Sequence, residues 1–188
     1  GRAALNVETR VVDDAMRDVK PGSGQIGEIV HRSPQLLKGY YHDEERTKAA
    51  FEGGWFHSGD LATIDDDGCI TVVDRKKDMI KTGGEIVVSG AVAAAIYTID
   101  GVSEVAVIGL PHPHWVEAVT AVIVRKPNAS SLTAHSVIDA CGKKLASFKT
   151  PKDVLFVDAL PKNPSGKLLK RELRLKFEQH YRGADAAA

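Results

Sequence analysis

The sequence predicts an α+β protein: a small C-terminal domain with a three-stranded sheet and flanking helices, preceded by a β-rich piece. Three observations lead to this prediction. Short apolar runs separated by turn residues fill residues 5–73, a charged run follows at 74–78, and strand-like and helix-like segments alternate beyond it. We therefore expect a first domain at residues 5–73, a second at 74–182 and a frayed tail at 183–188.

The first domain is expected to be mostly β. Its expected strands cover residues 6–12, 27–31, 61–64 and 69–73. Between the last two, Asp67-Gly68 tolerates the positive φ that a tight hairpin turn requires. Residues 43–51 carry alternating charge with apolar residues at helical spacing and stop before Gly53-Gly54, which predicts a short surface helix.

The second domain is expected to alternate strands and helices. Its expected strands cover residues 105–110, 118–124 and 154–157. Helices are expected to begin at Ser89, a residue type that caps helices well, and near Thr133. The spacing of Leu169, Leu173 and Phe177 puts them on one face and predicts a last helix.

Composition excludes several classes of protein. Twenty-five basic residues balance 25 acidic ones, so we expect no nucleic-acid partner and at most peripheral membrane contact. Cys69 and Cys141 lack metal-ligand or disulfide-framework spacing, which predicts no metal site and fits a reducing cytoplasm. No apolar run reaches the roughly 18 residues of a spanning helix. Residues 1–4 lead into a strand-like stretch without an initiator Met, as we expect for a piece of a longer protein.

Four motifs carry the chemistry of this sequence. They are GWFHSGD at 54–60, DRKKDMIKTGGE at 74–85, LPHPHWVEAV at 110–119 and PKNPSGKLLK at 161–170. In this order they resemble the adenylate-forming superfamily of acyl-CoA ligases, luciferases and peptide-synthetase adenylation domains. The resemblance covers the end of the family's large N-terminal domain, its hinge and its mobile C-terminal domain. It implies a full-length enzyme that adenylates a small-molecule carboxylic acid with ATP and Mg²⁺, then forms a thioester with coenzyme A; the missing N-terminal adenylation domain would be this chain's partner.

The resemblance assigns nucleotide binding to Asp60 and Arg75 and the hinge to Asp74. The glycine before Asp60 lets the backbone turn sharply, and a short carboxylate there suits the two hydroxyls of a ribose. A polar residue at a strand end, such as Asp74, can change φ and ψ without disturbing either core. Taken alone, an Asx-turn is the favoured interpretation of Asp60 and a solvated charged run is the usual one for residues 74–78; the four motifs together favour the functional assignment.

Lys167 is the predicted catalytic residue. Its loop is stiffened by Pro164, freed at Gly166 and followed by a basic helix. Adenylation brings a carboxylate against the α-phosphate, and a positioned ammonium that bridges both anions lowers the barrier electrostatically. The alternative is a surface lysine at a helix start, where the helix dipole disfavours a cation.

The resemblance assigns CoA binding to three residues of one loop: Lys81, Gly83 and Gly84. Two successive glycines permit close approach of the backbone to a ligand, although an ordinary tight turn would use the same residues. The sequence departs from the family at Ile86, Ala91 and Ala93, which replace an Asn and two Glu, and at Val116, which replaces a Gly. We expect these replacements to remove polar contacts on the hinge side and to affect the efficiency of thioester formation.

Two alternatives to a CoA ligase stay open. One is an adenylation module that serves a carrier protein or stops at the acyl-adenylate. The other is a non-catalytic binding relative that keeps the fold. In every case we expect the isolated chain to fold but to be inactive, because the family's pyrophosphate loop and acyl pocket lie upstream. Fatty or aryl acids fit the motifs best, while oligomeric state has no signal here.

Overall fold

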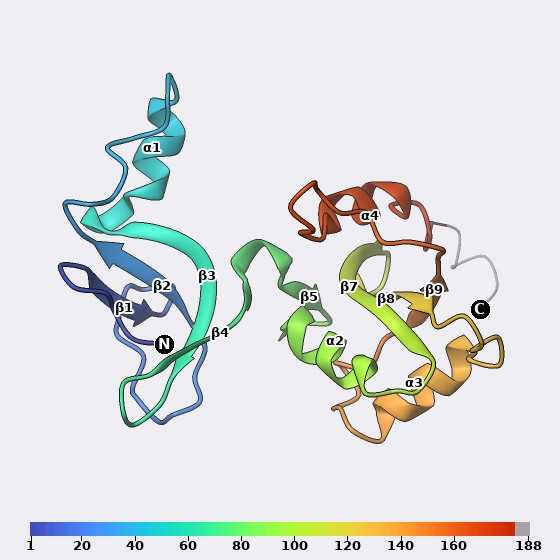
Figure 1. Ribbon diagram of the computed structural model, residues 1–188. Helices are drawn as coiled ribbons and strands as arrows, with labels where there is room; N and C mark the ends of the chain where they lie inside the picture. The colour runs from blue at the N-terminus through green and yellow to red at the C-terminus, as the bar shows by residue number, and fades with distance from the viewer. Residues whose placement is uncertain (183–188) are drawn as a thin grey trace. The chain divides into compact units, whose positions relative to one another are not determined.

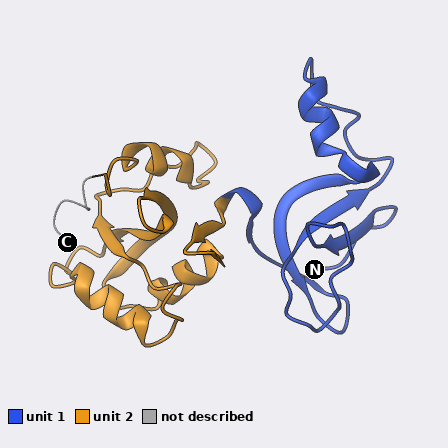
Figure 2. Ribbon diagram, turned by 180° about the vertical axis from the view of Figure 1, so that it is seen from behind, with its two compact units in different colours: residues 1–77 blue, residues 78–188 orange. Residues whose placement is uncertain are grey.

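The computed structural model describes residues 1–182, so the predicted tail at 183–188 lies outside the described residues. The chain divides into two compact units, Gly1–Lys77 and Asp78–Ala188 (Figure 2). The sequence put this boundary after Val73. The structural division falls later because strand pairing continues through Arg75.

Unit 1 is an antiparallel four-stranded sheet with strand order β1-β2-β3-β4 and one short helix (Figure 1). Its elements are β1 Glu8–Val12, β2 Gly27–Arg32, α1 Glu44–Ala50, η1 Glu52–Gly54, β3 Phe56–Ile64 and β4 Ile70–Arg75, followed by the 3-10 turn η2 Lys76–Asp78. The predicted strands and helix are confirmed, with β3 beginning earlier than expected. Asp43 caps α1 through a hydrogen bond from the backbone nitrogen of Arg46, and Gly68 has a φ of 75° in the predicted turn.

Unit 2 is a mixed sheet with helices on both faces (Figure 1). Its elements are β5 Ile80–Thr82, β6 Glu85–Val87, α2 Ser89–Tyr97, β7 Val102–His112, β8 Val116–Arg125, α3 Ala134–Gly142, β9 Asp153–Phe156 and α4 Lys170–Lys176. The strand order is β6-β5-β8-β7, and β9 pairs with β8 in parallel. The three strands expected from the sequence correspond to β7, β8 and β9. The predicted count of three is therefore corrected to five, because β5 and β6 have three residues each and are too short to show a strand pattern in the sequence.

Two hydrophobic clusters lie on opposite faces of the unit 2 sheet. One lies between the sheet and the helices α2 and α3. It includes Val92 and Ile96 of α2, Val137 of α3, Val107 of β7 and Val119 of β8. The other lies between α4 and the opposite face of the same strands. It includes Leu173 of α4, Ala106 and Ile108 of β7 and Ala118 of β8. The predicted α+β class is confirmed.

Polar contacts fix α4 to earlier parts of unit 2. Ser89 does not cap α2 as predicted: Val88 is the N-cap residue, and the fully buried Ser89 hydroxyl accepts a hydrogen bond of 2.6 Å from Lys170 Nζ. Arg174, one turn further along α4, contacts the buried carboxylate of Asp78 at 2.8 Å. The cap prediction was wrong because a tertiary partner takes the serine hydroxyl. The helix predicted to begin near Thr133 is confirmed as α3, and Thr133 caps it.

The helices of the described chain are short. Within residues 1–182, none combines the length and the apolar character that crossing a bilayer requires.

Candidate functional site

The residues predicted to bind ATP face each other in unit 1. Asp60 of β3 and Arg75 of β4 are direct partners in the strand register, and Arg75 Nε lies 3.3 Å from Asp60 Oδ1. Their side chains are 36% and 41% exposed, so a ligand can reach both. A carboxylate offers several acceptor positions, so an ion-paired Asp60 still has room to accept hydrogen bonds from a diol.

A bulge in β3 positions Asp60. One residue of β2, Ile29, lies opposite Ser58–Asp60 of β3, and Gly59 has a φ of 72° there. Ser58 Oγ donates to the carbonyl oxygen of Ile29 at 2.7 Å and accepts from the backbone nitrogen of Asp60 at 3.0 Å. The serine and glycine of this motif therefore set the local shape from which Asp60 projects.

A cavity of about 410 Å³ lies beside this pair, within unit 1. It is lined by Ser58, Gly59, Arg75, Lys76 and Lys77. The three basic residues among them suit an anionic ligand such as a phosphate group. Lys76 is already engaged, since its ammonium lies 3.0 Å from Glu28 and 3.4 Å from Asp14.

Asp74, the predicted hinge, lies next to Arg75 near the end of β4. It pairs with Leu61, and its Oδ1 accepts a hydrogen bond of 2.8 Å from the backbone nitrogen of Arg75. The strand register shifts between Leu61 and Ala62, which leaves Val73 without a register partner. Asp74 therefore lies beside an irregularity in the ladder rather than within a regular strand.

Gly83 and Gly84 form the two-residue turn of the β5–β6 hairpin, between the paired residues Thr82 and Glu85. Their φ angles are 56° and 84°, as a tight primed turn requires. The nitrogen of Gly83 donates to the carbonyl oxygen of Trp115 at 3.0 Å, which fixes the turn against the β7–β8 connection. No atom lies within 4 Å of the position that a Cβ on Gly84 would occupy, so the backbone there is open to approach.

Lys81 lies on β5 opposite Ile86, with its side chain exposed. Its backbone nitrogen donates to Glu117 Oε2 at 2.7 Å. Glu117 also occupies the space beside Gly109, since a Cβ there would come within 2.8 Å of the Glu117 carboxyl carbon. Glu117 thus joins β5 to β8. The preceding residue, Val116, has a φ of 69°, which strains a β-branched side chain.

Lys167 lies in a loop closed by Asn163. Asn163 Oδ1 accepts hydrogen bonds of 2.8 Å from the backbone nitrogen of Lys167 and from Ser165 Oγ. Asn163 also donates its own backbone nitrogen to the carbonyl oxygen of Lys167 at 2.9 Å, and Gly166 has a φ of 79°. Within residues 1–182 the Lys167 ammonium makes no ion pair, so an exposed cation projects from a fixed backbone.

The candidate groups of unit 2 attach to different parts of its sheet. Lys162, in the loop of Lys167, forms an ion pair of 2.7 Å with Glu104 near the start of β7. The glycine turn instead contacts Trp115, beyond the end of β7. In the described part of the chain, no hydrogen bond or ion pair joins Lys167 to the glycine turn. The structure therefore does not bring these two predicted groups together.

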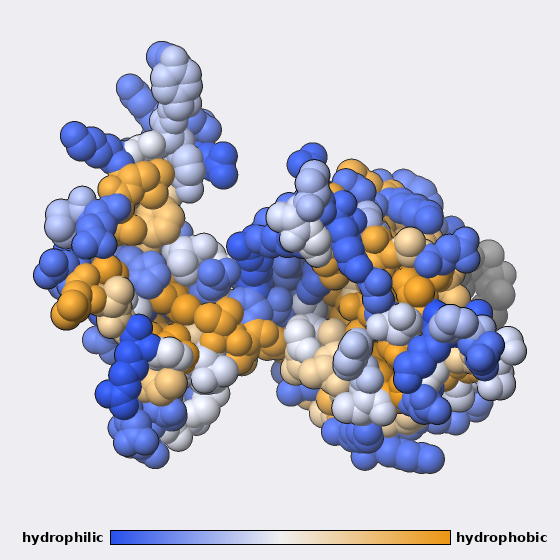
Figure 3. All heavy atoms as spheres, viewed as in Figure 1, coloured by the Kyte–Doolittle hydropathy of each residue, from blue (hydrophilic) through white to orange (hydrophobic). Residues whose placement is uncertain are grey.

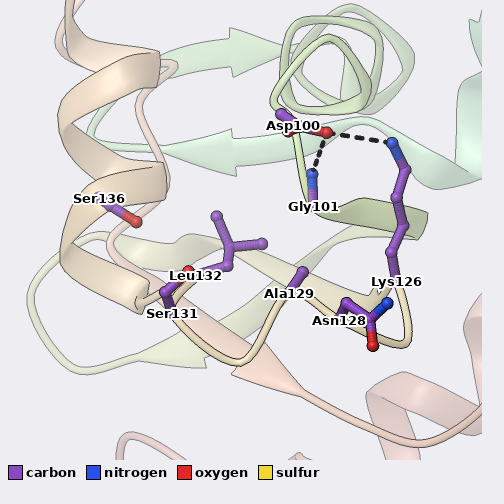
Figure 4. A pocket seen from close by; sticks show the side chains of 8 residues that line it. All are labelled: Asp100, Gly101, Lys126, Asn128, Ala129, Ser131, Leu132 and Ser136. Carbon is purple, nitrogen blue, oxygen red and sulfur yellow. Dashed lines mark hydrogen bonds and ion pairs between the residues drawn. The ribbon is translucent and has the colours of Figure 1, made fainter.

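A second cavity, of about 350 Å³, lies in unit 2 beside the start of β7 and α3 (Figure 4). On its rim Asp100 accepts hydrogen bonds from Lys126 Nζ at 3.2 Å and from the backbone nitrogen of Gly101 at 2.9 Å. None of the predicted site residues lines this cavity, so it is not part of the candidate site.

Known proteins match this chain along nearly all of its length. The family described as the AMP-binding enzyme C-terminal domain matches residues 91–167. A long-chain-fatty-acid–CoA ligase of Mycobacterium tuberculosis is 44% identical over 179 residues, which are 94% of this chain and 34% of that protein. A feruloyl-CoA synthase of Amycolatopsis is 42% identical over 177 residues, which are 94% of this chain and 35% of that protein. The crystal structure of ATP-bound MatB from Rhodopseudomonas palustris has a TM-score of 0.91 and 38% identity, covering 96% of this chain and 36% of that one.

The chain belongs to the adenylate-forming superfamily. It spans about a third of the length of the curated relatives it matches. The structure explains one departure from the superfamily pattern that the sequence revealed. A glycine is usual at the position of Val116, and the φ of 69° there is one that glycine adopts without strain.

Two residues that hold the candidate site together were not predicted. Asn163 closes the loop of Lys167 from within the PKNPSGKLLK motif. Glu28 lies buried in β2, with 7% of its surface exposed, and contacts the bulge of β3. The sequence signal for Glu28 was weak: Glu28 only precedes the apolar pair Ile29-Val30 in an expected strand, and a glutamate there suggests a solvent-facing position.

Proposed function

We propose that the protein containing this chain is an AMP-forming acid–thiol ligase, an acyl-CoA synthetase that adenylates a carboxylic acid with ATP and transfers the acyl group to CoA. The observation that carries this proposal is the Asp60–Arg75 pair beside a basic cavity. It offers an acceptor for ribose hydroxyls and cations for phosphate within one unit. Relatives that match 94% of this chain are named as long-chain-fatty-acid and feruloyl CoA ligases, which supports fatty or aryl acids as substrates.

Lys167 acts in the first half-reaction. The acid carboxylate attacks the α-phosphorus of ATP, a new O–P bond forms, and pyrophosphate leaves with the electrons of the broken P–O bond. An ammonium that contacts both anions offsets their repulsion and stabilises the charge that collects on the phosphoryl oxygens. Hydrogen bonds to the side chain and backbone of Asn163 fix the backbone of Lys167 in its loop, while the exposed ammonium stays available.

Lys81, Gly83 and Gly84 act in the second half-reaction, in which the CoA thiol displaces AMP from the acyl-adenylate. The open backbone of the glycine turn suits the narrow pantetheine arm of CoA, and Lys81 suits its phosphates. Because the glycine turn and Lys167 attach to different parts of the sheet, each half-reaction needs its own presentation of unit 2. We assign the pivot to Asp74, which lies beside an irregularity in its strand.

Magnesium is proposed to enter with ATP. In the described residues, no group of three or more His, Cys, Asp or Glu side chains could hold a metal ion. Mg²⁺ commonly binds through substrate phosphates and water rather than through an all-protein cage. The ion would supply charge neutralisation on the phosphates, whereas the contributions of this chain are Asp60, Arg75 and Lys167.

Unit 1 is proposed to pack against the N-terminal adenylation domain of the complete enzyme. The complete enzyme is proposed to function in the cytoplasm. Figure 3 shows apolar side chains gathered on the visible face of unit 1. Its exposed large apolar residues include Leu5 and Tyr41, each 90% exposed, and Val72 at 59%. Apolar surface of this kind marks contact areas more often than free surface.

The full-length protein that contains this chain tests the proposal. Supplied with ATP, CoA and a panel of fatty and aryl acids, it should release AMP and pyrophosphate in an acid-dependent manner and form acyl-CoA. The isolated chain should bring about neither reaction. Full-length protein that folds but releases no AMP with any acid would overturn the proposal, and turnover by the isolated chain would overturn its dependence on the N-terminal domain.

A second candidate is an adenylating enzyme that stops at the acyl-adenylate or serves a carrier protein. The observation that favours it is that apolar residues replace polar ones beside the proposed CoA loop. Ile86 is 54% exposed on β6, and Ala91 and Ala93 lie on α2. Trapping the acyl-adenylate with hydroxylamine separates the two candidates. Formation of hydroxamate without formation of acyl-CoA would favour the second candidate. Equal rates of hydroxamate formation and acyl-CoA formation would exclude it.

A further inference from the structure

Glu28 is a buried carboxylate that the proposed chemistry leaves unused. It is 7% exposed and lies in β2 between residues that are also buried, Gly27 and Ile29. Taking a carboxylate out of water is costly unless charges and hydrogen bonds compensate for the lost hydration. A glutamate at this position therefore depends on the partners that surround it.

Three partners surround the Glu28 carboxylate. Its Oε2 lies 3.0 Å from His57 Nδ1 and 3.0 Å from Lys76 Nζ, and its Oε1 accepts a hydrogen bond of 3.1 Å from the backbone nitrogen of Gly59. Burial raises the pKa of Glu28, but the hydrogen bonds and charges of His57 and Lys76 lower it by more, so its pKa lies below the ordinary 4.5. Burial lowers the pKa of Lys76, and its bonds to Glu28 and Asp14 raise it above the ordinary value.

These partners flank the two residues assigned to the nucleotide. Gly59 immediately precedes Asp60 in the bulge of β3, and Lys76 immediately follows Arg75 at the end of β4. Gly59 and Lys76 also line the cavity beside the Asp60–Arg75 pair. One carboxylate on β2 is thus bonded both to the bulge that presents Asp60 and to the strand end that presents Arg75.

We propose that Glu28 is a positioning residue for ATP: by binding the β3 bulge and the β4 end at once, it sets the spacing at which Asp60 and Arg75 meet one nucleotide. This inference rests on the proposed nucleotide site of unit 1. Glu28 itself touches no substrate. Its loss therefore acts through the geometry of Asp60 and Arg75, and the binding of ATP suffers while the binding of the acid and of CoA does not.

Glu28→Gln in the full-length enzyme tests this role. Glutamine keeps the shape and an acceptor for Gly59, but it loses the charge that holds His57 and Lys76. We expect KM for ATP to rise about tenfold, with KM for the acid and for CoA within about twofold of the parent. A merely structural role would lower the active fraction, and so kcat, without a selective rise in KM for ATP. Glu8→Gln on β1, whose side chain is 66% exposed, is the matched control and should change none of these constants.

Two further variants keep the outcome interpretable. Lys76→Met changes a side chain that is 45% exposed, so folding should persist even if Glu28→Gln misfolds, and KM for ATP should again rise. Asp60→Ala reports on the nucleotide site itself. If Asp60→Ala raises KM for ATP while Glu28→Gln and Lys76→Met leave it unchanged, the positioning role is overturned and the site stands. If Asp60→Ala also leaves it unchanged, the nucleotide site itself is overturned.

Discussion

The two units hold their candidate residues in different ways. In unit 1, Asp60 and Arg75 lie on paired strands, and the buried Glu28 bonds to both strand segments. In unit 2, Lys167 and the glycine turn lie in connections whose shape is set by local hydrogen bonds, including those of the Asn163 side chain, and both are exposed to solvent. The residues proposed to bind the nucleotide are therefore held by a sheet and a buried carboxylate, whereas the groups proposed to act in the chemistry lie on exposed turns.

Removing the cation of Lys167 should have the largest effect. Lys167→Ala in the full-length enzyme should slow acid-dependent pyrophosphate release by roughly a hundredfold or more, because the charge that offsets two colliding anions is lost. Conversion of supplied acyl-adenylate and CoA to acyl-CoA should change far less. Lys143→Ala, an exposed lysine at the end of α3, is the matched control. An unchanged adenylation rate would remove Lys167 from the mechanism.

Removing the carboxylate of Asp60 should weaken nucleotide binding next most strongly. Asp60→Ala should raise KM for ATP by about tenfold to a hundredfold, because hydrogen bonds to a charged group are worth about 1.5–3 kcal/mol. Steady-state kinetics with varied ATP measures the effect. Asp67→Ala, in the exposed turn of the same β3–β4 hairpin, should leave KM for ATP unchanged. Equal effects of the two substitutions would argue against a specific role for Asp60.

The buried carboxylate of unit 1 should show in the acid stability of the chain. The folded-state pKa of Glu28 lies below its ordinary 4.5, so its contribution is complete above about 4.5 and is lost as the pH falls through the folded value. At pH 7 we expect Glu28→Gln to lower the melting temperature by about 5 °C. Circular dichroism should show this gap closing as the pH falls below about 4.5, and a gap that widens in acid would contradict the assignment.

The strained residue of unit 2 should give the smallest effect, and in the opposite direction. Val116→Gly should stabilise unit 2 by about 0.5–1 kcal/mol, because relief of the positive φ exceeds the entropy that glycine adds to the unfolded chain. Val116 is 71% exposed, so little apolar burial is lost. Val72→Gly is the matched control: it is 59% exposed, lacks a positive φ, and should destabilise unit 1. The midpoints of urea unfolding measure the stability of both variants. A loss of stability in Val116→Gly would contradict the claim that the positive φ of Val116 is strained.

The strongly periodic parts of the fold could be predicted from the sequence. The strands β7, β8 and β9 contain the mostly apolar runs 105–110, 118–124 and 154–157, and the helix α3 has its apolar face. The β5–β6 hairpin was missed because strands of three residues carry no measurable period and β5 is held by pairing with Val116 of a distant strand. Ser89 was misassigned as a cap for a similar reason, since Lys170 is its neighbour only in the folded chain.

The candidate site was predictable where its residues stand in motifs. Asp60, Arg75 and Lys167 were assigned from the resemblance of four motifs taken together, since local rules alone favour an Asx-turn at Asp60 and a solvated charged run at Arg75. Glu28 was not predicted, because a glutamate in a strand suggests a solvent-facing position until the neighbouring strands are known. The residues proposed to contact ligands could thus be anticipated, whereas the residue proposed to set their spacing required the tertiary structure.

The attachment of α4 has a mechanical consequence. Arg174 bonds to Asp78, the first residue of unit 2, and Lys170 bonds to the start of α2. The loop of Lys167 leads directly into this helix. A backbone change at Asp78 would therefore act on α4 through two side-chain contacts, and α4 is the helix that directly follows the loop of Lys167.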